Sequence, residues 1–162
     1  MIRRHSKRKG FSLIELLIVV TIILIIAAIA IPNLMRSKIQ ANETAAVGAL
    51  KALQESTILY SNSYGGFPHS LSDLGPAASG SPATSASADL IDSVLAGGVK
   101  SGYRFNYAPG TTDPSGNVLT YTITATPVSP GSTGQRSFFT DQSGTIRNTS
   151  NGTADSTSAP LG

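Results

Sequence analysis

The polar and apolar positions of the chain change pattern at residue 31. From Phe11 to Ile31 the only polar residues are Ser12, Glu15 and Thr21. An apolar run of about twenty residues is the length that a helix needs to cross the roughly 30 Å hydrocarbon core of a bilayer. We therefore predict a transmembrane helix over residues 11–31.

The segment after this run keeps a helical period but becomes amphipathic. Pro32 follows the run directly, and a proline inside a helix removes one backbone hydrogen bond, so we expect a kink there. Polar residues, Glu43 among them, occupy the positions between the members of an apolar stripe. We predict that the helix continues over residues 32–60 and that its apolar face needs a cover. The stripe recurs at intervals of three, four or seven and comprises Ile39, Ala46, Leu50, Leu53, Thr57 and Tyr60.

The rest of the chain predicts a small antiparallel sheet. Residues 61–101 contain Gly and Pro punctuation and a short helix over Asp89–Leu95, which we expect Asp89 to cap. Alternating apolar positions within residues 102–147 indicate three or four strands. The predicted class is α+β, with the sheet packed on the amphipathic half of the long helix. Residues 148–162 are rich in Ser, Thr and Gly and predict a flexible tail.

The basic residues are concentrated before the apolar run. The chain has 12 Lys and Arg against 9 Asp and Glu, and five of the basic residues lie in the first nine positions: Arg3, Arg4, Lys7, Arg8 and Lys9. Such a cluster predicts that residues 1–10 are a cytoplasmic leader and that the rest faces outward. Without the leader, seven basic residues stand against nine acidic ones. No basic stripe then remains for a nucleic acid, so we expect no specific nucleic-acid partner.

Glu15 is the residue of the apolar run that needs explaining. A carboxylate within a membrane span costs about 2.5–3.5 kcal/mol on insertion scales, and the span holds no Lys, Arg or His to pair with it. A cut after Gly10 would create an amine at Phe11, about 6 Å from Glu15 along a helix axis. That amine could neutralise Glu15 of a neighbouring copy inside an apolar bundle.

The segment Gly10-Phe11-Ser12-Leu13-Ile14-Glu15 resembles the type III signal of type IV pilins and of type II secretion pseudopilins. The resemblance implies that a prepilin peptidase cuts between Gly10 and Phe11 and methylates the new amine. It assigns Glu15 to methylation and subunit register, and Pro32 to local melting during filament assembly. The alternative is a plain single-pass anchor in which Glu15 is tolerated.

The resemblance also implies a function and partners. As a type IV pilin, the chain would be a structural subunit that polymerises with itself and with minor pilins, served by prepilin peptidase, an inner-membrane assembly platform and an assembly ATPase. It would wait in the bacterial inner membrane, in contact with lipid, and end in an extracellular pilus. The runner-up is a type II secretion pseudopilin in a periplasmic pseudopilus that drives protein export. Ser- and Gly-rich loops favour a surface pilin. The small size of the chain and its lack of the disulfide that many type IV pilins have favour a pseudopilin. A membrane-anchored extracytoplasmic domain without a filament role is the third hypothesis.

The sequence offers little for catalysis. There is no cysteine, which excludes disulfides and thiolate metal sites, and no hydrolase or nucleotide-binding motif. We expect a protein that is not an enzyme and needs no cofactor. Since some pseudopilins bind Ca²⁺, Asp113 and Asp141 are weak Ca²⁺ candidates, but neither lies in a run with ligand spacing, and a turn is favoured. The strand-spaced aromatic residues, which favour a core over base stacking, are Tyr103, Phe105, Tyr107 and Tyr121.

Overall fold

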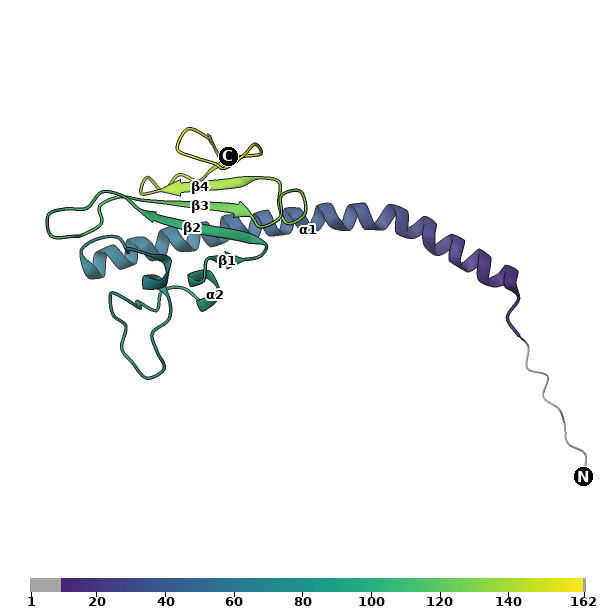
Figure 1. Ribbon diagram of the computed structural model, residues 1–162, viewed down its shortest axis with the longest axis horizontal. Coiled ribbons are helices and arrows are strands. Elements are labelled where there is room, and N and C mark those ends of the chain that lie inside the picture. The colour runs from purple at the N-terminus through teal and green to yellow at the C-terminus, as the bar shows by residue number, and fades with distance from the viewer. Residues whose placement is uncertain (1–9, 162) are drawn as a thin grey trace, which may run out of the picture. The chain divides into compact units, whose positions relative to one another are not determined.

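A computed structural model describes residues 10–161, so all of the predicted leader except Gly10 lies outside the described residues. The chain divides after Ser37 into two compact units. Helix α1 (Leu13–Tyr64) contributes residues to both (Figure 1). The first unit contains the part of α1 before Lys38, and the second, which we call the outer domain, is formed by residues 38–161.

The first unit is helical from Leu13 onward. Helix α1 continues through Pro32, as predicted, and the missing N–H of Pro32 leaves the carbonyl of Ala28 without its helical donor. The hydroxyl of Thr21 donates to the carbonyl of Leu17 (2.8 Å), which satisfies one polar group of the apolar run within the helix. By length and composition this helix is able to span a membrane, although no membrane is present in the structure.

The second unit contains one antiparallel sheet in which strands that are consecutive in sequence are neighbours. The prediction of an α+β fold with a long helix and a small antiparallel sheet is confirmed. The sheet has six strands rather than three or four, because three short strands carry too few residues to show an alternating pattern. The strands are β1 (Val99–Lys100), β2 (Tyr103–Pro109), β3 (Tyr121–Pro127), β4 (Ser137–Asp141), β5 (Arg147–Thr149) and β6 (Ala159–Pro160).

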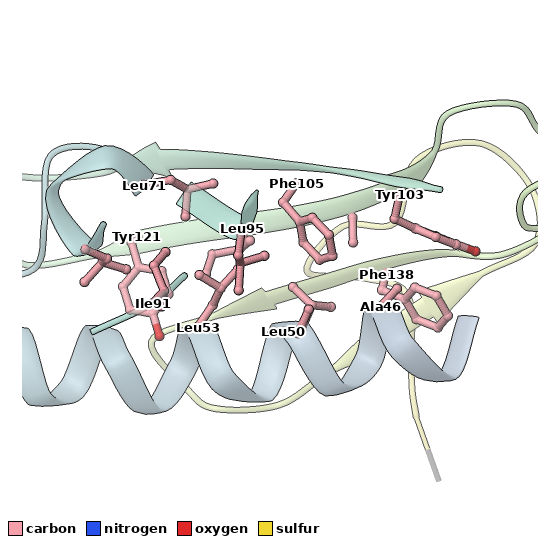
Figure 2. Packing of buried hydrophobic residues seen from close by; sticks show 14 of the residues in the cluster. Ala46, Leu50, Leu53, Leu71, Ile91, Leu95, Tyr103, Phe105, Tyr121 and Phe138 are labelled. Carbon is pink, nitrogen blue, oxygen red and sulfur yellow. The ribbon is translucent and has the colours of Figure 1, made fainter. Parts of the chain in front are cut away.

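The core lies between the second half of α1 and one face of the sheet (Figure 2). Strands β2 and β3 pair in a register that places Phe105 opposite Ala125, and both side chains are buried. The apolar stripe predicted for the helix is confirmed, since all six of its members are buried. The prediction that the strand aromatics fill the core is also confirmed: Tyr103, Phe105 and Tyr121 are buried, and Tyr107 packs against the same cluster.

The connection between α1 and the sheet contains two short helices. The 3₁₀ helix η1 (Leu71–Leu74) buries both of its leucines. Helix α2 (Ser93–Ala96) begins later than predicted, because Asp92 and not Asp89 accepts the capping hydrogen bond from the N–H of Leu95 (2.9 Å). Asp89 instead has a positive φ of 54° and lies outside the helix.

The C-terminal segment differs from the predicted flexible tail. It supplies strands β5 and β6, and Ala154 is 2% exposed. The hydroxyl of Ser137 on β4 donates to the carbonyl of Gly152 (2.7 Å) and accepts from the N–H of Ala154 (2.8 Å). Leu161 packs against the core. Residues 148–161 are therefore attached to the sheet at several points, through β5, Gly152, Ala154 and β6.

Candidate functional site

The N-terminal half of α1 and the three residues before it present a continuous apolar surface. Every large apolar side chain from Phe11 to Met35 is exposed, with Phe11 at 82% and Leu13 at 80%. An apolar surface of this size does not persist in water and marks a contact with lipid or with protein. The predicted membrane and assembly residues are thus brought together on one exposed element.

Glu15 occupies the first turn of this helix and has a local role. Because α1 begins at Leu13, Ser12 is the residue at the N-cap and Glu15 is the third residue of the helix. The Glu15 Oε2 atom accepts a hydrogen bond from the N–H of Ser12 (3.1 Å), which is one half of a capping box. The predicted spacing of 6 Å between Phe11 and Glu15 assumed a helix from residue 11, and the later start corrects it.

The charge of Glu15 is not matched within the described chain. Residues 10–161 contain two ion pairs, Lys100 with Asp92 and Arg136 with Glu43, and Glu15 belongs to neither. Its side chain is exposed among apolar neighbours. The capping hydrogen bond therefore satisfies one carboxylate oxygen but leaves the negative charge available for an outside cation.

Gly10 and Phe11 lie before the helix, in a segment that is exposed and has no regular secondary structure. A Cβ atom added to Gly10 would meet no atom within 4 Å, so packing does not require glycine at this position. Phe11 is likewise exposed and contributes nothing to the core. Neither residue contributes to packing, and both are exposed; their assignment to processing stays a prediction.

Pro32 lies in the same exposed part of α1, at the end of the predicted span. The helix is continuous on both sides of it, although a proline there cannot donate a hydrogen bond to the carbonyl of Ala28 and its ring crowds that carbonyl. Its assignment to melting during assembly stays a prediction.

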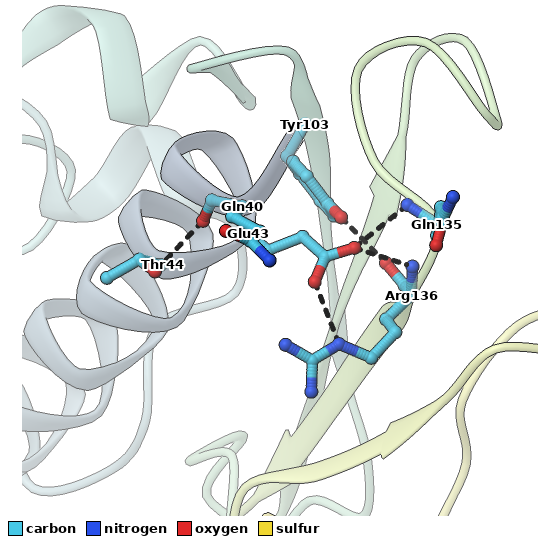
Figure 3. A network of polar contacts seen from close by, with 6 residues as sticks. All are labelled: Gln40, Glu43, Thr44, Tyr103, Gln135 and Arg136. Atoms are coloured by element: carbon cyan, nitrogen blue, oxygen red, sulfur yellow. Dashed lines mark hydrogen bonds and ion pairs between the residues drawn. The ribbon is translucent and has the colours of Figure 1, made fainter. Parts of the chain in front are cut away.

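The outer domain contains a polar site around Glu43, a residue whose predicted place on the polar side of the helix is wrong. Glu43 of α1 is 6% exposed and accepts from the N–H groups of Gln135 (2.9 Å) and Arg136 (3.1 Å). Its other oxygen accepts from Nε of Arg136 (2.8 Å), as Figure 3 shows. Burial opposes ionisation, but the hydrogen bonds from Gln135 and Arg136 outweigh it and lower the pKa of Glu43.

Two further hydrogen bonds hold the same loop. The side-chain amide of Asn42 on α1 donates to the carbonyl of Thr133 (2.9 Å), and the hydroxyl of Tyr103 on β2 donates to the carbonyl of Arg136 (2.7 Å). Glu43 lies three residues before Ala46 and seven before Leu50, both buried, and this spacing is the signal that places it on the buried face. We call Glu43, Gln135 and Arg136 the carboxylate clamp.

The Ca²⁺ candidates each form their own turn. Both oxygens of Asp113 accept hydrogen bonds, from the N–H groups of Ser115 and Asn117 and from the Asn117 amide, at 2.8–2.9 Å. Asp141 accepts from the N–H of Ser143 (2.9 Å). Within residues 10–161 no group of three acidic or histidine side chains is arranged to hold a metal ion.

Comparison with known proteins identifies the N-terminal region. Residues 5–31 match the family model of the prokaryotic N-terminal methylation motif. The chain carries this methylation motif. The match includes Gly10, Phe11 and Glu15, and it confirms the resemblance to type IV pilins and type II secretion pseudopilins.

The relatives of this chain include members of each of these two groups. The chain is 44% identical over 70 residues to the type IV wide pilus major component PilA4 of Thermus thermophilus, covering 41% of this chain and 53% of that protein. It is 36% identical over 58 residues to the type II secretion system core protein G of Escherichia coli, covering 36% and 40% respectively. With the type IV major pilin protein PilA of Myxococcus xanthus it shares 49% identity over 51 residues, 32% of this chain and 23% of that one.

These alignments span about half or less of the relatives' length. No solved structure matches the chain. The family model covers residues 5–31 of this chain, and each of the three alignments covers less than half of it.

Proposed function

We propose that this protein is a structural subunit of a type IV pilus. The observation that carries the proposal is the methylation motif placed directly on an exposed, apolar helix. In the membrane, lipid covers this surface, and in a filament, the same surfaces of neighbouring subunits cover one another. Apolar surface removed from water contributes roughly 25 cal/mol per Å², so residues 11–35 are a large source of cohesion.

Processing supplies the group that Glu15 lacks. Cleavage between Gly10 and Phe11 creates an amine one residue before Ser12, whose N–H already binds the Glu15 carboxylate. Methylation keeps this amine basic, and its positive charge neutralises Glu15 of an adjacent subunit. Because an ion pair in apolar surroundings is favourable only when both members meet, it sets the register between subunits.

The second candidate is a type II secretion pseudopilin. Its similarity to the core protein G of Escherichia coli, 36% identity over 58 residues, supports this candidate. Processing and the Glu15 pair are the same in this alternative, and the product is a periplasmic pseudopilus that acts in protein export. A membrane-anchored domain without a filament role is the remaining candidate.

Mass spectrometry of filaments sheared from native cells tests the proposal. We expect abundant protein that begins at Phe11 and carries one added methyl group. Methylated protein confined to the cell envelope would favour the pseudopilin. Functional protein that still carries residues 1–10 would overturn both and leave the plain anchor.

Two pairs of variants test the individual residues. Gly10→Val is expected to block cleavage, whereas the control Gly10→Ala, with a small side chain, is cleaved. Glu15→Gln keeps an oxygen that accepts the Ser12 N–H but removes the charge, so it separates capping from charge pairing. We expect Glu15→Gln to be cleaved and to fail in assembly. Normal filaments from Glu15→Gln would show that the charge is dispensable.

A further inference from the structure

A cleft at the C-terminal end of α1 has no role in the proposed assembly. It has a volume of about 440 Å³ and lies where the loops after α1 and between β2 and β3 meet the segment around Ser85. Small-molecule sites occupy about 300–1,000 Å³ and combine aromatic walls with a few polar groups. The residues that matter to its chemistry are Tyr60, Tyr64, His69, Asp73, Ser85 and Ser115.

The walls of this cleft are held by hydrogen bonds that do not use its open polar groups. Tyr60 donates to the carbonyl of Ser85 (2.7 Å), and the N–H of Phe67 donates to the carbonyl of Val118 (2.8 Å). Asp73 accepts from the N–H of His69 (2.9 Å). The three loops are thereby fixed to one another, and the cleft exists before any ligand arrives.

Four polar groups of the lining are available to a ligand. The hydroxyls of Tyr64, Ser85 and Ser115 and the ring of His69 make no hydrogen bond to another residue of the described range 10–161. A hydroxyl both donates and accepts, and so does a neutral imidazole. The ring of Tyr64, 37% exposed and 4.7 Å from the ring of Tyr60, adds an accessible apolar wall.

The charged groups of the lining disfavour anionic and cationic ligands. No Lys or Arg is among the described residues that line the cleft, which disfavours phosphates and carboxylates. Asp73 is the only carboxylate there, and its oxygens already accept from the N–H groups of His69 and Ser70 and from the Ser70 hydroxyl. These three hydrogen bonds already occupy acceptor sites of Asp73, so it has little capacity left to accept from the N–H groups of an organic cation.

We propose that this cleft binds a carbohydrate, a mono- or disaccharide unit of a glycan. A pyranose ring has an apolar face that packs on an aromatic ring and a rim of hydroxyls that both donate and accept. Tyr64 supplies the aromatic face, and His69, Ser85 and Ser115 supply partners for the rim. The site belongs to residues 60–118 and is independent of filament assembly.

Saturation-transfer difference NMR on the full chain tests the proposal. The protein is solubilised in a polyoxyethylene detergent, which contains neither sugar nor ammonium groups. The probes are lactose, maltose and N,N′-diacetylchitobiose, with tetramethylammonium as the cation probe. We expect saturation transfer to at least one sugar, and about tenfold weaker binding in Tyr64→Ala, which corresponds to about 1.4 kcal/mol of lost ring contact.

The control is Ser63→Ala, because the Ser63 hydroxyl donates to the Leu59 carbonyl (3.0 Å) within the helix and does not line the cleft. It is expected to bind the sugar as the wild type does. Absence of transfer to all three sugars, or transfer that Tyr64→Ala leaves unchanged, would overturn the proposal. A response to tetramethylammonium alone that Tyr64→Ala abolishes would overturn the sugar assignment and identify an aromatic cage. Since the solubilised chain is uncut, none of these results depends on the proposed pilus.

Discussion

Replacing Glu43 by alanine is the most informative test of the outer domain. The side chain of Glu43 is 7% exposed, and the carboxylate clamp joins α1 to a loop that lies 92 residues later in the chain. The substitution removes three hydrogen bonds at once and leaves two backbone N–H groups without their acceptor.

The expected magnitude follows from how exposed each partner is. Breaking a fully buried ion pair from one side costs about 3–5 kcal/mol. The Arg136 side chain is 42% exposed and regains water, so its share is small. Each N–H group of Gln135 and Arg136 that loses its acceptor costs about 1–3 kcal/mol, less where water enters. We expect the free energy of unfolding of the outer domain to fall by about 2–4 kcal/mol.

Tyrosine fluorescence during urea unfolding of the detergent-solubilised chain is a suitable assay. The chain has five tyrosines and no tryptophan, and all five tyrosines lie in the outer domain, so the signal does not report on the apolar helix. The matched control is Glu55→Ala, an exposed glutamate of the same helix, which should change stability by less than about 0.5 kcal/mol.

The pH dependence gives an independent check. The hydrogen bonds of the clamp lower the pKa of Glu43, so its ionised form stabilises the folded state above the ordinary pKa of glutamate. That contribution is lost as the pH falls through the lowered pKa. The difference between the wild type and Glu43→Ala should therefore shrink as the solution becomes acidic. A loss below about 1 kcal/mol at neutral pH, or a difference that grows towards low pH, would refute the role of the clamp.

Three further outcomes are expected by the same assay or by absorbance. Leu53→Ala, at a fully buried position, should lower stability by about 2–5 kcal/mol, whereas Ile58→Ala, at a position 53% exposed, should have little effect; equal losses would contradict the packing. Gly134→Ala should destabilise, because its Cβ would overlap the hydroxyl of Tyr103, while Gly48→Ala, with nothing within 4 Å, should stabilise the helix by about 0.5–1 kcal/mol. Burial and the charge of Glu43 raise the pKa of Tyr103 to about 12. The neutral hydroxyl of Tyr103 therefore stabilises the folded state below pH 10, and this contribution is lost as the pH rises towards 12. Ultraviolet titration showing Tyr103 ionised near pH 10 would contradict this.

The sequence predicted the features that depend on local pattern. The helical period of the apolar residues and the length of the apolar run were sufficient to predict α1. The alternation of Tyr103 and Phe105 with polar residues was sufficient to predict a core strand. The methylation motif is local as well, since Gly10, Phe11 and Glu15 lie within six consecutive residues.

Features that depend on distant partners were not predicted. The sequence pattern around Glu43 indicates a surface residue, because the loop at Gln135 that supplies its hydrogen-bond donors is distant in the sequence. The Ser- and Thr-rich composition of the C-terminal segment indicates flexibility, yet the bonds of Ser137 to Gly152 and Ala154 attach it to the sheet. Asp89 and Asp92 both precede apolar residues, and only the backbone conformation decides which one caps α2.

The two outermost strands of the sheet have a consequence for crowding. Strands β1 and β6 are each two residues long, and β6 ends in Pro160, which has no N–H to donate. At the β6 border a foreign strand finds almost no ladder to extend, which is one way in which sheets avoid fusing edge to edge, whereas β1 covers only Tyr103 and Arg104 of β2. The β6 border can therefore lie against another copy of the domain with little tendency to pair strand to strand. In the proposed filament, association between copies would fall to the exposed apolar helix, where processing would control it.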